Sequence, residues 1–213
     1  MRILMIGMMA FLLLPAVATA NSDETVFAYP VAAKNKKAFT QTIKHLQMQA
    51  EQIKGFTQKK QIAALRRPLV STGIIVLSAK GICLSTRTPF SSAVKITTQG
   101  IWQQMGSRKA TVKQADEHFE IRHIANILIA LFTADHIVLE KRFTMFYHDA
   151  ENQFQIGLRP KDRILAKIIS QIVIEGTDQI NRIAIREVNG DQTEIAISSE
   201  APQELITLEN CIQ

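Results

Sequence analysis

Apolar residues recur along most of the chain in short alternating runs, which is the spacing of β-strands rather than of long helices. Phe154, Ile156 and Leu158 alternate with polar residues, and side chains two positions apart lie on the same face of a strand. Further short runs are found at residues 56–62, 74–77, 82–86, 93–97 and 101–103. A spacing of about 8–12 residues between such runs predicts a meander of antiparallel strands.

Two segments have helical periodicity instead. Phe39, Ile43 and Leu46 form an apolar stripe that continues through Ala50 and Ile53, which predicts an amphipathic helix from Asn35 to about Gln52. A second helix is predicted from about residue 117 to residue 133, and its part from Ile124 to Phe132 is apolar nearly all round. A helix of that kind is either buried on every side or alternates between two apolar environments. A plain core helix and a lid at 121–132 over the sheet therefore both fit.

Strands are predicted again in the last third of the chain. In the segment 137–147, Ile137, Leu139, Phe143, Met145 and Tyr147 alternate and share one face. Asn189-Gly190 separates the strands 180–188 and 192–197 and favours a two-residue type I′ hairpin, because both central positions need a positive φ. Many short strands with two or three helices predict an α+β fold, built on a strongly curved antiparallel sheet or half-barrel.

The first residues have the features of an export signal. Arg2 precedes an apolar run, and Ala18-Thr19-Ala20 matches the small-residue site of signal peptidase. We therefore expect residues 1–20 to be a cleaved signal peptide and 21–213 to be a single periplasmic domain. An uncleaved membrane anchor is the alternative, although the apolar run is shorter than the roughly 20 residues that a spanning helix needs.

The charge balance is moderately basic, with a formal net charge of +6 and a pI of about 9.4. Such an excess favours attraction to anionic surfaces or partners. Lys59, Lys60, Arg66 and Arg67 are candidates for contact with an anionic membrane or an acidic partner, and a solvated basic edge is the alternative. With one Trp, two Tyr and no aromatic–basic box, nucleic acid is not an expected partner.

Cys83 and Cys211 are the two cysteines of the chain. The periplasm is oxidising, and two cysteines allow a single internal pairing, so they are candidates for a disulfide. Two buried free thiols that pack as small apolar side chains are the alternative.

The sequence contains none of the motifs that would indicate an enzyme, a metal site or a cofactor. H-E-x-x-H, G-x-S-x-G, the P-loop and G-x-G-x-x-G are all absent. His118 and His123 are five residues apart, which fits a solvated helix face better than a metal site. We therefore expect no catalytic residue, no metal and no cofactor.

The feature that remains is an excess of apolar surface, on the predicted inward faces of the strands and on the lid. Acyl chains beneath such a lid would gain about 0.8 kcal/mol for each buried CH₂ without any polar chemistry. A shift of one residue in a strand would exchange its two faces. The residues predicted to line this cavity are Phe56, Ile74, Val76, Ile124, Leu128, Leu131, Phe143, Met145, Phe154 and Ile156.

Three blocks in order resemble a known family. An amphipathic helix is followed by Gly55-Phe56-Thr57-Gln58-Lys59, then by Thr88-Pro89-Phe90, then by a strand from Val94 and a Gly-containing turn before Trp102. The pattern resembles LolA, the periplasmic carrier of outer-membrane lipoproteins. The resemblance implies an unclosed barrel of about 11 strands with helices at one mouth and acyl chains in the cavity. It also implies an inner-membrane release complex as donor and an outer-membrane acceptor. We expect a monomer.

The chain departs from the family at the lid latch. Ser78 stands where the family has an Arg that holds the lid, Lys80 lacks the planar fork of Arg, and Leu84 replaces the usual Trp. The chain therefore resembles a divergent member, whose cargo could be a polyene or glycolipid of a dedicated pathway rather than lipoproteins. Two further classes stay open: a non-catalytic envelope adaptor that docks through its apolar helix, and an enzyme acting on lipid or glycan, which needs a polar cluster inside the cavity.

Overall fold

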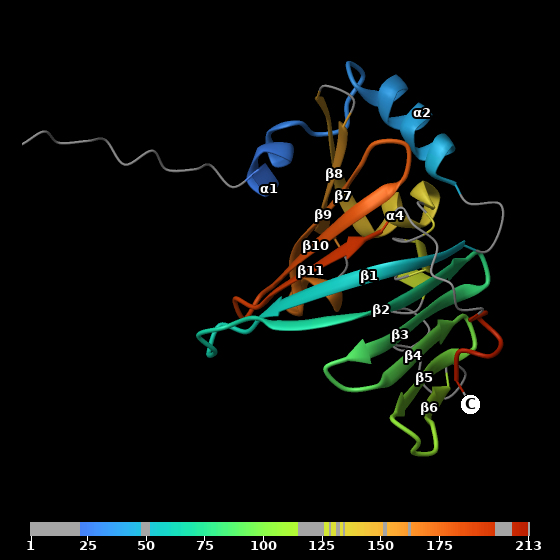
Figure 1. Cartoon of the computed structure of the whole chain (residues 1–213). Helices are drawn as coiled ribbons and strands as arrows, with labels where there is room; N and C mark the ends of the chain where they lie inside the picture. The colour runs from blue at the N-terminus through green and yellow to red at the C-terminus, as the bar shows by residue number, and fades with distance from the viewer. Residues whose placement is uncertain are drawn as a thin grey trace, which may run out of the picture.

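The computed structural model describes residues 22–47, 52–114, 126–127, 129–130, 133, 135–150, 153–161, 163–198 and 206–212. These residues form one antiparallel sheet of eleven strands and a few short helices (Figure 1). The strands are β1 Gln52–Gln61, β2 Leu69–Ser78, β3 Gly81–Thr88, β4 Ser92–Thr97, β5 Gly100–Met105, β6 Thr111–Gln114, β7 Phe143–Ala150, β8 Gln153–Pro160, β9 Ile169–Gly176, β10 Ile180–Glu187 and β11 Gln192–Ile197. The helical elements are α1 Ser22–Thr25, η1 Val26–Ala28, α2 Lys36–Leu46, α4 His136–Arg142 and η2 Leu165–Lys167.

The strand order is β6-β5-β4-β3-β2-β1-β11-β10-β9-β8-β7. Two meanders meet where β1 pairs with β11, with Phe56 opposite Ile197. Among the strands described, β6 and β7 are the two edges and do not pair with each other, so the sheet is not closed. The chain from Tyr29 to Val31 runs along β7 and forms two backbone hydrogen bonds with it. The predicted fold class, an unclosed antiparallel half-barrel with few helices, is confirmed.

The sheet is strongly curved (Figure 1), and its pairing is irregular between β2 and β3. The register between β2 and β3 shifts between Thr72 and Gly73, and a Cβ atom at Gly73 would collide with the backbone carbonyl of Ser85. Only glycine allows the two backbones to approach this closely, and such irregularities increase the local twist of a strand pair.

The bend gives the sheet an inner and an outer face (Figure 1). The inner face carries the main core cluster, which joins Ile82 and Ile96 of one meander to Phe143 and Leu158 of the other. Helices α2 and α4 pack on this cluster through Phe39, Ile43, Leu46 and Leu139. The outer face carries two smaller clusters, one beneath η1 and one beneath the C-terminal segment 206–212.

The prediction of a strand from residue 137 is wrong for its first part. Residues 136–142 form helix α4, because the side chain of Asp135 accepts hydrogen bonds from the backbone N–H groups of Ile137 and Val138 and so caps the helix. Ile137 is 58% exposed while Leu139 is buried, so the two do not share a face. The strand begins at Phe143, and from there the alternation is as predicted.

Two predicted boundaries also differ. Helix α2 ends at Leu46 rather than near Gln52, which is the first residue of β1. In the β10–β11 hairpin, residues 188–190 lie between the hydrogen-bonded pair Glu187 and Asp191, in place of the predicted two-residue type I′ turn. Gly190 donates to the Glu187 carbonyl with a φ of 91°, and the Glu187 N–H donates to the Asp191 carbonyl. A turn followed by a left-handed glycine is the next most common hairpin connection.

Several predicted features fall outside the described residues. The predicted signal peptide at residues 1–20 is one of them. Most of the predicted lid at 121–132 is another, including the predicted cavity residues Ile124, Leu128 and Leu131. Asn126, Ile127, Ile129 and Ala130 are described and are helical. Of the helices that the structure describes, none combines the length and apolar character that a membrane span requires.

Candidate functional site

Five of the predicted cavity residues lie together on the inner face. Phe56, Phe143, Met145, Phe154 and Ile156 are buried and belong to the same core cluster. They come from β1, β7 and β8, on both sides of the junction between the two meanders.

The other two predicted cavity residues that the structure describes, Ile74 and Val76, do not lie on the inner face. In β2 the inner face carries Ile75 and Leu77 rather than Ile74 and Val76. Val76 packs in a separate cluster on the outer face, and Ile74, two residues earlier on the strand, shares its side. The run from Ile74 to Leu77 is apolar at every position and buried throughout, so alternation does not reveal which face is which.

Val76 lies against the two cysteines. Cys83 and Cys211 are joined by a disulfide, with their Cα atoms 6.3 Å apart and 128 residues between them in sequence. Both cysteines pack with Val76 and Leu208. The bond holds the segment 206–212 on the outer face of β2 and β3, away from the inner cluster.

One pocket reaches the inner cluster beside helix α4. Its volume is about 530 Å³. Ile127, Ile129 and Ala130 contribute apolar walls, and all three belong to the inner cluster. Ala79 of the β2–β3 turn is exposed at its margin. The remaining lining residues are Thr98, Asn126, Thr133, Asp135, Val138, Lys141 and Arg142.

A second pocket, of about 150 Å³, lies at the C-terminal end of α2. Leu46, Leu77 and Ile197 line it and belong to the inner cluster. Its polar margin includes His45 and Asp178. Each pocket thus combines an apolar wall with polar groups at the margin, which is the usual composition of a site for an apolar ligand with a polar end.

Helix α2 is attached to the sheet through Tyr147. The Phe39 and Tyr147 rings meet edge to face with centroids 5.7 Å apart, and the Tyr147 and Thr42 hydroxyls are 2.8 Å apart. Burial raises the pKa of the Tyr147 phenol above its ordinary value, so the phenol stays protonated and able to form this bond near neutral pH.

Ser78, at the position of the family latch, donates instead to the Gly81 carbonyl and accepts from the Lys80 N–H within the β2–β3 turn.

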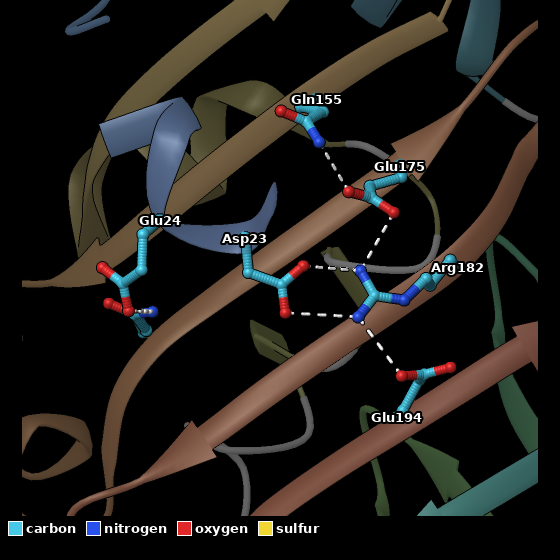
Figure 2. A network of polar contacts seen from close by, with 7 residues as sticks. Asp23, Glu24, Gln155, Glu175, Arg182 and Glu194 are labelled. Atoms are coloured by element: carbon cyan, nitrogen blue, oxygen red, sulfur yellow. Dashed lines mark hydrogen bonds and ion pairs between the residues drawn. The ribbon is translucent and has the colours of Figure 1, made fainter. Parts of the chain in front are cut away.

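A charged network centred on Arg182 lies on the outer face (Figure 2). The Arg182 guanidinium donates to both carboxylate oxygens of Asp23, and it also donates to Glu175 and Glu194. These bonds, led by those to Asp23, raise the pKa of Arg182 above its ordinary value. Glu175 also accepts from the Gln155 amide at 2.7 Å. The network fixes α1 on β9, β10 and β11, and sequence patterns gave no indication of it.

The two faces therefore differ in chemistry. The inner cluster consists of aliphatic and aromatic side chains, and the buried carboxylate of Glu175 lies with Arg182 on the other side. Within the described ranges, no group of three or more His, Cys, Asp or Glu side chains is arranged to hold a metal ion. An apolar surface of this kind attracts ligands through the hydrophobic effect, which has no directional requirement.

No protein-family model and no curated protein sequence matches the chain. Similar solved structures include a LolA superfamily protein from Nitrosomonas europaea, at 7% identity and a TM-score of 0.43, covering 80% of this chain and 94% of that one. Another is a DUF1329 family protein from Desulfovibrio piger, at 8% identity and a TM-score of 0.43, covering 81% and 94%. A domain named for outer-membrane lipoprotein sorting, from Vibrio parahaemolyticus, has 8% identity and a TM-score of 0.40, covering 80% and 93%. These three TM-scores lie below 0.5, so the similarity to these structures carries no argument about function.

Proposed function

We propose that the protein is a non-catalytic carrier that shields the acyl chains of a lipid, or of a lipid-modified protein, on the inner face of its half-barrel. The observation that carries the proposal is the apolar lining of that face, which two pockets reach beside α2 and α4. Acyl chains entering there would displace these helical segments from the inner cluster and take over their apolar contacts. Each buried CH₂ contributes about 0.8 kcal/mol.

The compartment and the partners form part of the same proposal. We infer that signal peptidase cleaves after Ala20 and that the mature chain acts in the periplasm as a monomer. By resemblance, an inner-membrane release complex would supply the cargo and an outer-membrane acceptor would receive it. The disulfide between Cys83 and Cys211 fits an oxidising compartment. Intact mass of the exported protein tests the cleavage, since it should lack residues 1–20.

Native mass spectrometry of protein purified without detergent tests whether lipid is bound. We expect lipid-sized adducts on the mature mass, lost after extraction with organic solvent. A mass without adducts, together with tight binding of another envelope protein, would favour the adaptor function instead.

Binding of a fluorescent fatty acid locates the site. Ala79→Trp places a large side chain at the exposed margin of the pocket beside α4 without altering the core. We expect it to weaken probe binding tenfold or more. Ile129→Asp puts a charge on the apolar wall and should have at least the same effect, because an unpaired charge is costly in an apolar pocket. Ile137→Asp is the matched control, since Ile137 is exposed on α4, and it should change affinity less than about twofold.

Urea unfolding of the same variants separates binding from folding, because Ile129 is buried whereas Ala79 is not. If both Ala79→Trp and Ile129→Asp bind the fluorescent fatty acid with wild-type affinity, acyl chains do not enter at this pocket. Failure of the wild-type protein to bind the probe at all would contradict the carrier function.

A further inference from the structure

Three loops meet at one end of the sheet. Gln61 at the end of β1 pairs with Gln192, and Gln192 also pairs with Arg186 near the end of β10. Glu187 then pairs with Ile169 at the start of β9. The loops β1–β2, β10–β11 and β8–β9 therefore lie next to one another, in that spatial order, along one end of the sheet (Figure 1). We define the hairpin rim as residues 62–70, 163–168 and 188–190.

Direct contacts fix these loops to one another. The Ala63 N–H donates to the Asp191 carboxylate at 2.9 Å, and the Val188 N–H donates to the Ile168 carbonyl at 2.9 Å. Lys60, at the base of the β1–β2 loop, forms an ion pair with Glu187 at 2.9 Å. The hairpin rim is thus a connected surface of the fold.

Exposed apolar side chains are concentrated on this surface. Six of the eleven large apolar side chains that are exposed among the described residues lie on it. Val188 is 56% exposed and Leu69 is 50% exposed. The other four are Leu65, Val70, Ile164 and Ile168. Soluble proteins rarely gather exposed apolar groups in one place unless that place binds something.

The charges beside these groups are basic. Arg66, Arg67, Arg163 and Lys167 are exposed on the hairpin rim. The neighbouring described carboxylates are already engaged, since Glu187 binds Lys60 and the buried Asp191 accepts from Ala63. The basic excess remains even when Asp162, which lies outside the described residues, is counted as a negative charge.

We propose that the hairpin rim docks on the surface of an anionic phospholipid bilayer. Leu65, Leu69 and Val188 enter the boundary between headgroups and acyl chains, while Arg66 and Arg67 bind lipid phosphates. Aliphatic side chains flanked by Lys and Arg are the combination that binds peripheral proteins to such surfaces. The β1–β2 hairpin projects beyond the rest of the sheet (Figure 1), so its tip reaches a bilayer before the sheet does. This docking requires no bound cargo and is independent of the carrier function.

Partitioning onto lipid vesicles tests the proposal with the exported protein, its N-terminus defined by intact mass. We expect strong binding to phosphatidylcholine vesicles that contain about 30% phosphatidylglycerol, weak binding to pure phosphatidylcholine, and loss of the difference near 1 M salt. Arg66→Gln/Arg67→Gln should lower the partition coefficient about thirtyfold, since each basic residue near an anionic surface contributes about a factor of five.

Lys36→Gln/Lys37→Gln is the matched control, because it removes the same charge from exposed positions on α2. Lys36 and Lys37 begin α2, and the neighbouring Asn35 side chain donates to the Tyr147 carbonyl. Tyr147 aligns through Ile156 with Ile174, near the end of β9, whereas the hairpin rim lies at the start of β9. The control should change partitioning less than about threefold if position matters more than net charge. Equal losses in the two double variants would overturn the proposal.

A fluorescence reporter tests insertion itself. In Leu65→Trp, the added indole should shift its emission to the blue on anionic vesicles and not on neutral ones, relative to protein with the native Trp102 alone. An unshifted spectrum, or absence of wild-type binding to anionic vesicles, would overturn membrane docking. The exposed apolar side chains of the rim would then indicate a binding surface for another protein. The variants should keep their affinity for the fatty-acid probe, which separates this outcome from failure of the carrier function.

Discussion

Arg182→Met should destabilise the protein by about 3 kcal/mol, because it leaves a buried carboxylate without its cation. The side chain of Glu175 is only 8% exposed, and its partner Arg182 lies 2.9 Å away. Removal of one member of a buried ion pair costs about 3–5 kcal/mol. We expect the lower end of that range, because Glu175 keeps its hydrogen bond from the Gln155 amide.

The other two carboxylates of the network add little to this cost. Asp23 and Glu194 are 20% and 42% exposed and can be hydrated when Arg182 is absent. An exposed pair such as Arg182–Glu194 contributes about 1 kcal/mol or less. Glu175→Gln in the Arg182→Met background should therefore restore most of the lost stability, since it removes the uncompensated charge and preserves the shape of the side chain.

Urea unfolding with linear extrapolation measures these differences. Arg186→Met is the matched control, because Arg186 binds Glu24, whose side chain is 49% exposed, and the loss there should be below about 1 kcal/mol. A cost for Arg182→Met no greater than that for Arg186→Met, or a failure of Glu175→Gln to restore stability, would refute the role of Arg182 as the cation of a buried carboxylate.

Two further predictions concern the covalent and backbone constraints of the sheet. Cys83→Ser/Cys211→Ser should lower the free energy of unfolding by at most about 5 kcal/mol, the loop-entropy value for a bond that spans 128 residues; reductant should do the same to the wild type and leave the double variant unchanged. Gly73→Ala should cost more than about 2 kcal/mol in urea unfolding, because the new Cβ would collide with the Ser85 backbone. Gly55→Ala, whose Cβ would meet only ordinary contact at 3.4 Å, should cost less than about 1 kcal/mol, and equal losses at the two glycines would contradict this account.

Clean alternation identified the strands that have one apolar and one polar face. Phe154 and Ile156 belong to the inner cluster, and the polar residues Gln153 and Gln155 alternate with them on the other side of the strand. The pattern left the register of β10 and β11 open, and the structure places Ile183 opposite Ile195. Repetition of such runs with short turns is what made the open antiparallel sheet predictable.

Prediction failed where the physical cause lies outside the local pattern. β2 is buried on both faces because the disulfide-bonded C-terminal segment covers its outer side, so its run of apolar residues cannot show which side faces inward. Residues 136–142 form a helix because the Asp135 side chain caps it, although the alternation of Ile137 and Leu139 favours a strand. Asp23 and Arg182 are 159 residues apart in sequence, and no periodicity links two such positions.

The two pockets of the inner face and the hairpin rim share no lining residue, so the two proposals can fail independently, and the pocket and rim variants together show whether docking serves delivery. Pocket variants such as Ala79→Trp should lose the fatty-acid probe and keep vesicle binding, and Arg66→Gln/Arg67→Gln should do the reverse. A protein that shows both activities brings its lipid to a bilayer surface directly, so cargo exchange with vesicles should slow in the rim variants even though their pockets are intact. If exchange is equally fast in those variants, docking does not serve delivery, and an acceptor protein must receive the cargo instead.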